Sequence, residues 1–318
     1  MSAGTPWQSV LAPAGEAAQT IATMSWVLII GSTLIFIAVM LLLAWAVWRR
    51  RPATAGEDAP VHARRWIIGG GVLFPLVVLL ALMVYSTWRT PGWLEKPPPG
   101  ALIVSVTGHL WWWEVRYRDP ATGAEVTLAN ELRLPVGQTA WIGLNSADVI
   151  HSFWVPALAG KIDMVPGRVN HLLVKPTQAG TWRGQCAEFC GEQHARMALH
   201  VVVEPPDTFD RWLAAQARPA APPDTALVTQ GRGAFMAQRC NACHTVRGDS
   251  EEGRLGPDLT HVGSRLYLGA GTLRNDAANL AHWVHDTQAA KPGARMPSSP
   301  DMDPATLKAI TAYLEHLQ

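Results

Sequence analysis

The chain has 318 residues, of which 48% are hydrophobic and 16% are charged, and its formal net charge is +1 at pH 7. This length suffices for two or three domains of roughly 100–200 residues each, and the charged fraction is below the roughly 25% usual for soluble proteins. The near-zero net charge excludes a strongly basic nucleic-acid-binding protein, so we expect no nucleic-acid partner.

Two long runs near the N-terminus, residues 17–48 and 66–88, contain no Asp, Glu, Lys or Arg. The shorter run of 23 residues reaches about 35 Å as a helix, and a hydrocarbon core is about 30 Å thick. We therefore predict a transmembrane hairpin within residues 1–95, with helices at about 24–48 and 66–88. Two buried core helices are the alternative, which uncharged runs of this length disfavour.

The orientation of this hairpin follows from its arginines. The first 23 residues contain neither Lys nor Arg, whereas the predicted loop carries Arg49, Arg50, Arg51, Arg64 and Arg65. The positive-inside rule places the loop in the cytoplasm and both chain ends outside. No basic segment precedes the first apolar run, so we expect a retained helix rather than a cleaved signal peptide. Residues after 89 then face the periplasm or the cell exterior, where unbound thiols tend to oxidise.

Residues 96–216 are dominated by short β-branched and aromatic runs separated by Gly, Pro, Asn and Asp, which predict a sandwich or barrel. The clearest runs are ALIVSVTGHLWWWEVRY, EVTLANELRLPVG, QTAWIGLNSADVIHSFWVP, NHLLVKPTQAGTWRGQC and ALHVVVEP. Residues 207–216 predict a short helix with Asp207 as its cap. The proline-rich residues 217–225 predict a linker.

From residue 226 to 318 the pattern becomes helical, and we predict a separate all-α domain. The final helix shows the clearest signals. Asp303 is placed as its N-cap and Pro304 as its first helical residue. One face of this helix is apolar, formed by Leu307, Ile310, Leu314 and Leu317.

The sequence CNACH, residues 240–244, has the C-x-x-C-H spacing of a c-type haem attachment site. One helical turn presents Cys240 and Cys243 to the two vinyl groups, and His244 then faces the iron. A redox-active C-x-x-C pair does not need the following histidine, and a structural disulfide is the remaining alternative. A helical domain on the oxidising side favours haem.

The iron of such a haem needs a sixth ligand. Met296, within KPGARMPSSP, is the best candidate, because His/Met ligation is used by cytochromes c. Met302 stands between two aspartates, a poor setting for a buried thioether. The remaining candidates are His261, His282 and His285.

Residues 225–318 resemble a class I cytochrome c. The resemblance rests on Gly231 and Phe235 before CNACH, on GPDL at 256–259, on RMP, and on Tyr313 in the last helix. It implies that the first and last helices of this domain cross each other. It also implies that Pro257 packs near His244.

A second cluster of metal-ligating residue types is CAEFCGEQHARM, residues 186–197. A disulfide between Cys186 and Cys190 would leave His194 and Met197 unexplained. A blue-copper site uses one cysteine, and Met is a poor zinc ligand. Two bridging thiolates suit two copper ions, and His151, 35 residues before Cys186, is available as a second histidine.

The pattern HSFWVP followed by CAEFCGEQHARM resembles the dinuclear copper A site of cytochrome c oxidase subunit II. The resemblance implies that the copper ligands are His151, Cys186, Cys190, His194, Met197 and the backbone carbonyl of Glu188. It implies in addition that the Glu188 carboxylate reaches a magnesium ion at the boundary with the catalytic subunit.

The resemblance covers nearly the whole chain and extends to the caa-type bacterial oxidases, in which a cytochrome domain is fused to this subunit. The implied fold is multidomain: the two-helix transmembrane hairpin of residues 1–95, an all-β cupredoxin-like copper A sandwich at 96–216, the linker at 217–225, and an all-α class I cytochrome c domain at 226–318.

Three tryptophans, Trp111–Trp113, lie where the family has a Trp-aromatic-Trp run after G-H-Q. This chain reads G-H-L, so Leu110 departs from the pattern. The first tryptophan of the family is where electrons enter near copper, which maps to Trp111. The alternative is a set of core or rim aromatics on a strand, where successive side chains face opposite sides.

Together these features predict an electron-transfer subunit of a proton-translocating, oxygen-reducing cytochrome c oxidase in the bacterial plasma membrane. Electrons would pass from cytochrome c or another donor to covalent haem c, then to copper A. They would finally reach the haem-copper subunit I, with subunit III as a further partner. A copper A subunit of a nitric oxide reductase and a freestanding membrane-tethered electron carrier are the alternatives. A quinol oxidase subunit lacks these copper ligands.

Overall fold

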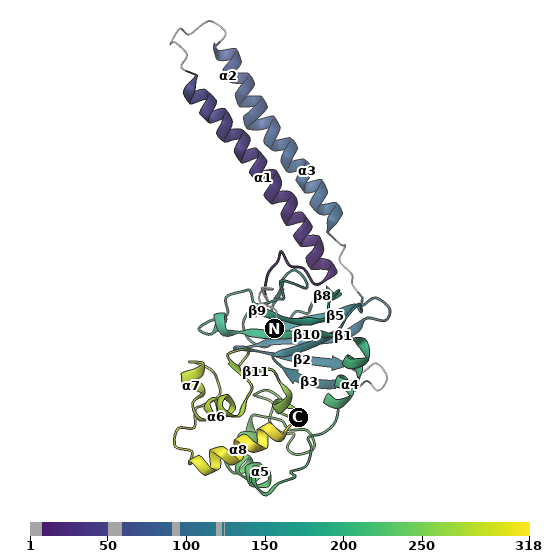
Figure 1. Ribbon diagram of the computed structural model, residues 1–318, viewed down its shortest axis with the longest axis vertical. Coiled ribbons are helices and arrows are strands. Elements are labelled where there is room, and N and C mark those ends of the chain that lie inside the picture. Colours follow the sequence, from purple (N-terminus) through teal and green to yellow (C-terminus); the bar gives the residue numbers. More distant parts are fainter. Residues whose placement is uncertain (1–7, 50–58, 91–95, 119–122, 124) are drawn as a thin grey trace. The chain divides into compact units, whose positions relative to one another are not determined.

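The computed structural model describes residues 8–49, 59–90, 96–118, 123 and 125–318. The chain forms two compact units. One unit comprises the residues up to Gln19 together with Pro97–Gln318, and the other is Thr20–Lys96. Figure 1 labels the elements of both.

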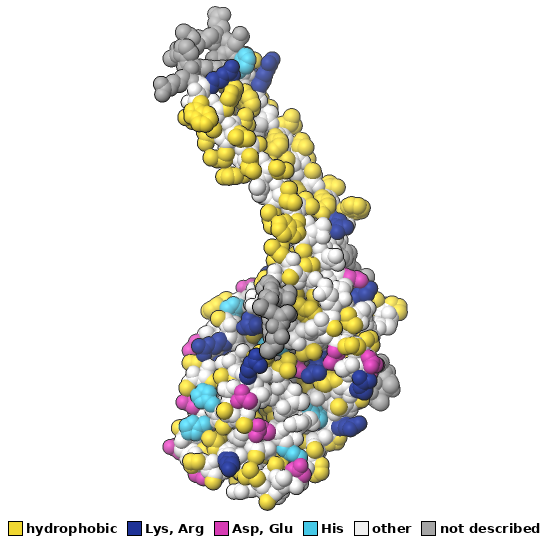
Figure 2. Space-filling model, in the orientation of Figure 1, with side chains coloured by type: hydrophobic (Ala, Val, Ile, Leu, Met, Phe, Trp, Pro, Cys, Tyr) yellow, Lys and Arg dark blue, Asp and Glu magenta, His cyan; other side chains and the backbone are white. Residues whose placement is uncertain are grey.

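The hairpin unit consists of long apolar helices. The first is α1 (Glu16–Trp48), and the second combines α2 (Ala59–Ile68), the π-helical segment η1 (Gly69–Leu73) and α3 (Phe74–Arg89). Both are long and apolar enough to cross a membrane, and their apolar windows are not buried in protein. Hydrophobic side chains cover the visible face of both helices (Figure 2). This exposure argues against the alternative of two core helices.

Both helices begin earlier than predicted. The first begins at Glu16 rather than about residue 24, because the small and polar residues that follow contain no helix breaker. The second begins at Ala59 rather than 66, so Arg64 and Arg65 lie in α2 and not in a loop. A run of apolar residues predicts the part of a helix that crosses the membrane, but the helix itself can extend beyond that run. Arg50 and Arg51 of the orientation argument lie outside the described residues.

The widened segment η1 lies at the three glycines of the second helix. There the N–H of Phe74 donates to the carbonyl of Gly69, five residues earlier. Pro75, which has no N–H to donate, stands in the first turn of α3. A π-helical turn beside a proline is one of the recognised ways in which a helix adjusts its hydrogen bonds.

Residues 102–204 fold into two five-stranded sheets that form a sandwich, as predicted. The first sheet has the order β3-β2-β1-β5-β8 and the second the order β4-β10-β9-β6-β7. The strands of the first are β1 (Leu102–His109), β2 (Trp112–Arg118), β3 (Glu125–Ala129), β5 (Ala140–Ser146) and β8 (Asn170–Val174). Those of the second are β4 (Glu131–Pro135), β6 (His151–Trp154), β7 (Ile162–Met164), β9 (Gly180–Cys186) and β10 (Ala198–Glu204).

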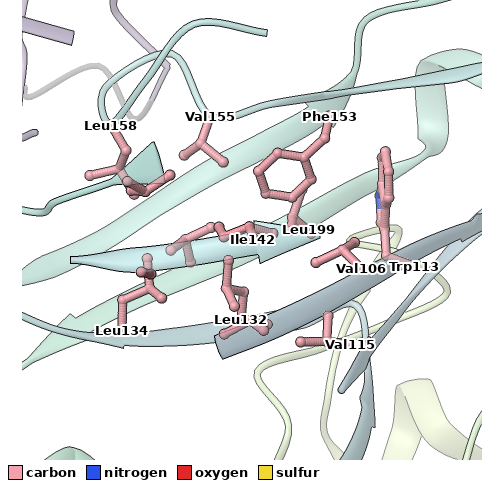
Figure 3. Packing of buried hydrophobic residues seen from close by; sticks show 14 of the residues in the cluster. Val106, Trp113, Val115, Leu132, Leu134, Ile142, Phe153, Val155, Leu158 and Leu199 are labelled. Atoms are coloured by element: carbon pink, nitrogen blue, oxygen red, sulfur yellow. The ribbon is translucent and has the colours of Figure 1, made fainter. Parts of the chain in front are cut away.

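The core of the sandwich lies between the two sheets. Strand β1 alternates buried and more exposed residues, as a strand with one covered face does. Figure 3 shows side chains of both sheets packed together, among them Val106 and Trp113 from the first and Leu132, Phe153 and Leu199 from the second. Burial of this apolar surface is the main source of the stability of the fold.

The helix after the sandwich, α4 (Pro206–Gln216), corrects one prediction. Its N-cap is Pro205, and no side chain caps it. Asp207 lies inside the first turn instead and pairs with Arg211 at 3.2 Å on the surface. Proline fixes its own φ angle near the helical value, so the helix begins before Asp207. The N-cap is therefore Pro205 instead of Asp207.

The C-terminal part contains the helices α5 (Ala226–Ala237), α6 (Ala277–His285), α7 (Thr287–Ala290) and α8 (Pro304–His316), which gather beside the sandwich (Figure 1). A short antiparallel pair, β11 (Tyr267–Leu268) with β12 (Leu273–Arg274), interrupts the predicted all-α pattern. The predicted cap of α8 is confirmed, because the Asp303 carboxylate accepts from the N–H groups of Ala305 and Thr306.

The first and last helices of this part cross at close range, as the resemblance implied. A side chain at Gly231 of α5 would meet the carbonyl oxygen of Ala309 in α8 at only 1.9 Å. Glycine therefore permits the crossing. The rings of Phe235 and Tyr313 then pack edge to face with centroids 5.5 Å apart.

Candidate metal centre and haem site

The donor atoms of the copper motif come from two neighbouring strands and the loop between β9 and β10. His151 begins β6, and Cys186 ends β9, which pairs with β6 through Phe153 and Cys186. Cys190 lies in the loop that follows β9, His194 begins the 3-10 turn η2 (His194–Arg196), and Met197 follows that turn. Pairing of β6 with β9 thus brings residues 35 positions apart to one place.

These five side chains form what we call the sulfur pocket: His151, Cys186, Cys190, His194 and Met197. The sulfur atoms of Cys186 and Cys190 lie 3.8 Å apart, far beyond the ~2.05 Å of a disulfide. The Cys190 sulfur lies 3.8 Å from Sδ of Met197 and 3.7 Å from Nδ1 of His194. The Cys186 sulfur lies 3.8 Å from Nδ1 of His151. Each cysteine therefore has its own histidine.

The pocket is buried. Cys186 and Cys190 are 4% and 5% exposed, His151 is fully buried and Met197 is 1% exposed. The hydrogen bond from the Cys190 thiol lowers the pKa of Cys186 well below its ordinary value, which favours the thiolate form of Cys186. Thiolate is the form in which cysteine binds metal.

Asp148 orients His151, and the sequence reasoning missed this residue. The Asp148 carboxylate lies 3.0 Å from Nε2 of His151, so the imidazole donates from Nε2 and directs Nδ1 toward Cys186. Burial alone would raise the pKa of Asp148, but hydrogen bonds from His151, Val149 and Leu110 hold it below its usual value. A carboxylate three residues before a ligand-type histidine was the available signal, since such pairs recur around metal sites.

The backbone carbonyl and the side-chain carboxylate of Glu188 lie in different surroundings. The Cys186 thiol lies 3.1 Å from the backbone carbonyl of Glu188, so this oxygen faces the sulfur pair. The Glu188 side chain is exposed, as is that of Phe189 beside it. The structure therefore separates a carbonyl that faces the pocket from a carboxylate at its edge.

The three consecutive tryptophans have three different settings. Trp111 is half-buried and donates from Nε1 to the carbonyl of Cys190 at 2.8 Å. Trp112 stacks on His109 with ring centroids 4.3 Å apart, and Trp113 is fully buried in the core. Of the three, Trp111 is the one bonded to the cysteine loop.

The Cys240–His244 turn presents two half-buried thiols and one oriented imidazole. Cys240 begins the 3-10 turn η3 (Cys240–Ala242), and Cys243 follows it. Nδ1 of His244 lies 2.8 Å from the carbonyl of Pro257, which confirms the implied neighbourhood of these residues. This bond leaves Nε2 as the available ligand atom, and burial lowers the pKa of His244 and favours the neutral, ligating form.

The candidates for a sixth iron ligand differ in their surroundings. Met296 is half-buried, and its carbonyl accepts from the Gln288 side chain at 2.8 Å. Met302 is partly buried and packs against the core of this part, contrary to the prediction of a poor setting. His261 is bonded at both ring nitrogens, to the carbonyls of Gln318 and Arg218. His282 and His285 lie on α6.

Comparison with known proteins finds matches for the segments that contain the copper motif and the haem motif. Residues 121–204 match the family model "Cytochrome C oxidase subunit II, periplasmic domain", and residues 228–318 match that of cytochrome c. Cytochrome c oxidase subunit 2 of Alkalihalophilus pseudofirmus is 33% identical over 317 residues, covering 98% of this chain and 91% of that protein. The chain belongs to the cytochrome c oxidase subunit 2 family.

A further subunit 2, from Bacillus subtilis, is 27% identical and covers 99% of this chain and 93% of that protein. Among solved structures, the periplasmic domain of subunit II of cytochrome oxidase from Bradyrhizobium japonicum is 32% identical. It covers 38% of this chain and 96% of that one, with a TM-score of 0.35. The two family matches together show a subunit 2 domain followed by a cytochrome c domain.

The residues of this subunit 2 chain fit the groups that the two family matches imply, copper A and haem. Two free cysteine sulfurs at bridging distance, two imidazole nitrogens and one thioether form a donor set suited to copper rather than to Mg²⁺ or Ca²⁺. The Cys240 and Cys243 thiols are likewise unbonded to each other, and His244 keeps Nε2 available. These are the groups that covalent haem attachment requires.

Proposed function

We propose that this chain is the electron-transferring subunit of a haem-copper oxidase that reduces oxygen in the bacterial plasma membrane. The observation that carries the proposal is the buried sulfur pair, 3.8 Å apart and flanked on each side by a histidine. When bound, copper A and covalent haem c supply the one-electron relay between a donor, such as cytochrome c, and the catalytic subunit I.

The chain's residues have distinct tasks in this proposal. The thiolates of Cys186 and Cys190 would hold the copper pair, and His151, His194, Met197 and the Glu188 carbonyl would complete the ligand set. Asp148 fixes the tautomer and orientation of His151. Because His151 and Cys186 lie on paired strands and most of the donors are buried, the protein has little freedom to rearrange when charge changes. Rigid donors suit electron transfer, in which no protein bond is made or broken.

On the haem side, Cys240 and Cys243 would hold the porphyrin covalently, and His244 and Met296 would ligate its iron. The Pro257 carbonyl orients His244 as Asp148 orients His151. Trp111, bonded to the Cys190 carbonyl, is the residue through which electrons reach the sulfur pocket. The exposed Glu188 carboxylate binds magnesium at the boundary with subunit I.

The hairpin anchors the chain by two passes, with the sulfur pocket and the haem site on the periplasmic or outer side. Two helices rather than one favour a docked subunit over a tethered carrier, since one helix suffices as a tether. Subunit I, and subunit III beside it, are the partners. Oxygen reduction and proton translocation occur in that assembly.

The test uses a Cys186→Ser variant in the complete complex, purified in mild detergent. We expect haem c to be reduced as in the unmodified protein, copper content to fall, and oxygen consumption to be lost, because a hydroxyl does not replace a bridging thiolate. Ser105→Ala, on an exposed position of β1, is the control and should leave all three unchanged.

Oxygen consumption that survived Cys186→Ser would overturn the proposed role of the pocket. Assays of the same complex with each gas separate the alternatives: reduction of nitric oxide without oxygen would identify a nitric oxide reductase subunit. Purification without a haem-copper partner would indicate a freestanding carrier.

A further inference from the structure

Lys291, the residue after α7, is buried although its side chain carries an ammonium group. It is 2% exposed. Its Nζ donates to three backbone carbonyls, those of Trp111 at 2.8 Å, Arg196 at 2.9 Å and Gly269 at 2.9 Å. An ammonium has three N–H donors, so all of them are used. Within the part of the chain that the structure describes, no carboxylate forms an ion pair with it.

The three carbonyls belong to two different parts of the chain. Gly269 follows β11 in the cytochrome part, whereas Trp111 and Arg196 belong to segments next to the sulfur pocket. The Trp111 side chain bonds to Cys190, and Arg196 directly precedes Met197. Lys291 therefore joins the cytochrome part to the two backbone segments that enclose the proposed copper site.

The segment after Lys291 is rigid and leads to Met296. Gln288 donates to the carbonyls of Ala294 and Met296, each at 2.8 Å, and accepts from the N–H of Gly293 at 2.9 Å. The Gln288 side chain thus holds the loop together through three hydrogen bonds. Lys291 attaches the beginning of this braced loop, and with it the proposed iron ligand, to the sandwich.

Gly293 shows how closely this loop approaches the sulfur pocket. A side chain there would lie 2.6 Å from Oε2 of Glu192 and 3.6 Å from the ring of Trp111. Its φ of +76° also favours glycine. Arg196 provides a second link, because its Nη1 donates to the carbonyl of Ala290 at 2.9 Å.

The chemistry of Lys291 argues against simple space filling. Burial lowers the pKa of Lys291 to about 7. A buried ammonium is costly unless its donors are satisfied. An aliphatic side chain would fill the same volume without that cost, but it would not join the three carbonyls.

We propose that Lys291 is a positioning residue that clamps the Met296 loop of the cytochrome part against Trp111 and Arg196, so that electrons pass to the sulfur pocket from one fixed arrangement. This inference rests on the proposed function for the identity of the two redox groups. In the step concerned, one electron leaves haem c and one enters the copper centre. No bond forms or breaks, and no proton moves.

The test compares Lys291→Met with the unmodified chain in the complete detergent-purified complex. A small reductant is mixed rapidly with the oxidised complex, and the absorption bands of haem c and of copper A are followed separately. We expect haem c to be reduced at an unchanged rate and the subsequent reduction of copper A to slow about tenfold, because three hydrogen bonds from a charged donor are lost. Lys308→Met, at an exposed lysine of α8, is the matched control.

Two further measurements separate positioning from damage. The electron paramagnetic resonance signal of copper A should not change, because Lys291 donates to no ligand atom. Amide hydrogen exchange should accelerate in residues 266–272 and 289–294 of Lys291→Met but not of Lys308→Met. An unchanged transfer rate, unchanged exchange, or an altered copper signal would each overturn the clamp.

Failure of the proposed function has a different outcome. An unmodified complex that lacked the haem c or copper A signal would contradict the assignment of the redox groups. Hydrogen exchange requires neither signal, so the clamp itself is still decided by the comparison of the two variants.

Discussion

The sulfur pocket and the Cys240–His244 turn differ in where their donor atoms come from. The pocket draws on two strands and a loop, and strand pairing joins His151 to Cys186 across 35 residues. The haem motif places two thiols and an imidazole within five consecutive residues. The pocket is therefore assembled by the tertiary fold, whereas the haem turn is assembled by local backbone geometry.

The two sites differ in burial as well. The cysteines of the pocket are almost completely buried within a sandwich that has its own apolar core. Cys240 and Cys243 are half-buried in a smaller part of the chain with its own, smaller cluster of apolar residues. The fold itself holds the largely buried donors of the sulfur pocket in place. The partly exposed Cys240–His244 turn depends more on the group that it binds. We therefore expect the sulfur pocket to keep its copper when the haem is lost.

The strongest test of this comparison is the double variant Cys240→Ser, Cys243→Ser. We expect covalent haem to fall to near zero and the C-terminal part to lose cooperative unfolding, because a domain of this size relies on its cofactor to complete the core. Copper per chain should stay unchanged, since every donor of the pocket lies in the sandwich. Metal analysis with circular dichroism provides the measurement.

The reciprocal control is Cys186→Ser, which should lose copper and keep haem. Loss of copper together with haem in the double cysteine variant would contradict the independence of the two sites.

A smaller effect concerns the contact between the two parts. His200 of β10 stacks on Tyr267 of β11, with ring centroids 3.9 Å apart. Burial, together with the charge of Arg183, lowers the pKa of His200 to about 4. The unfolded chain, with an ordinary histidine pKa of about 6.5, binds this proton first as the pH falls. Stability is therefore full above pH ~6.5 and is lost toward pH ~4, by up to about 3 kcal/mol.

His200→Phe keeps a ring against Tyr267 but has no proton to bind. Chemical unfolding of both proteins at several pH values between these limits should show a shallower loss in the variant. Carboxylates with lowered pKa values are present in both and cancel in the difference. Equal pH slopes would show that the stacked pair does not couple the two parts.

The smallest predicted effect lies within the sulfur pocket. Asp148→Asn keeps the shape of the side chain but removes the charge that orients His151. We expect copper affinity to fall about 10–100-fold, the usual consequence of losing such a partner, while haem content is unchanged. Competitive titration with a copper chelator measures this. Unchanged affinity would mean that strand geometry alone orients His151.

Spacing along the chain was sufficient for features that depend on local geometry. The haem turn, the Asp303 cap and the two apolar helices could all be predicted, because each is specified within a few turns of backbone. The limits of these elements were less well predicted. Helix α1 continues to Glu16, and Pro205 displaces Asp207 as the cap of α4, since helix limits depend on residues that composition alone does not mark.

Contacts between distant segments required the folded structure. The three-residue spacing of Asp148 and His151 only hints at their contact, and the fold is needed to show it. Met302 packs against a core that its two aspartate neighbours seemed to exclude. Lys291 is the clearest case. In the sequence it is an ordinary lysine before a loop rich in proline and small residues, and only docking of the two parts buries its ammonium among three carbonyls.

The sequence by itself therefore determined which donor groups this protein carries and which two helices are apolar enough to cross a membrane, because residue type and local periodicity are properties of short segments. Tertiary structure alone decided which second residue orients each donor and how the haem part is joined to the sulfur pocket. The physical reason is that burial and hydrogen bonding between segments exist only once the sheets have paired and the two parts have packed together.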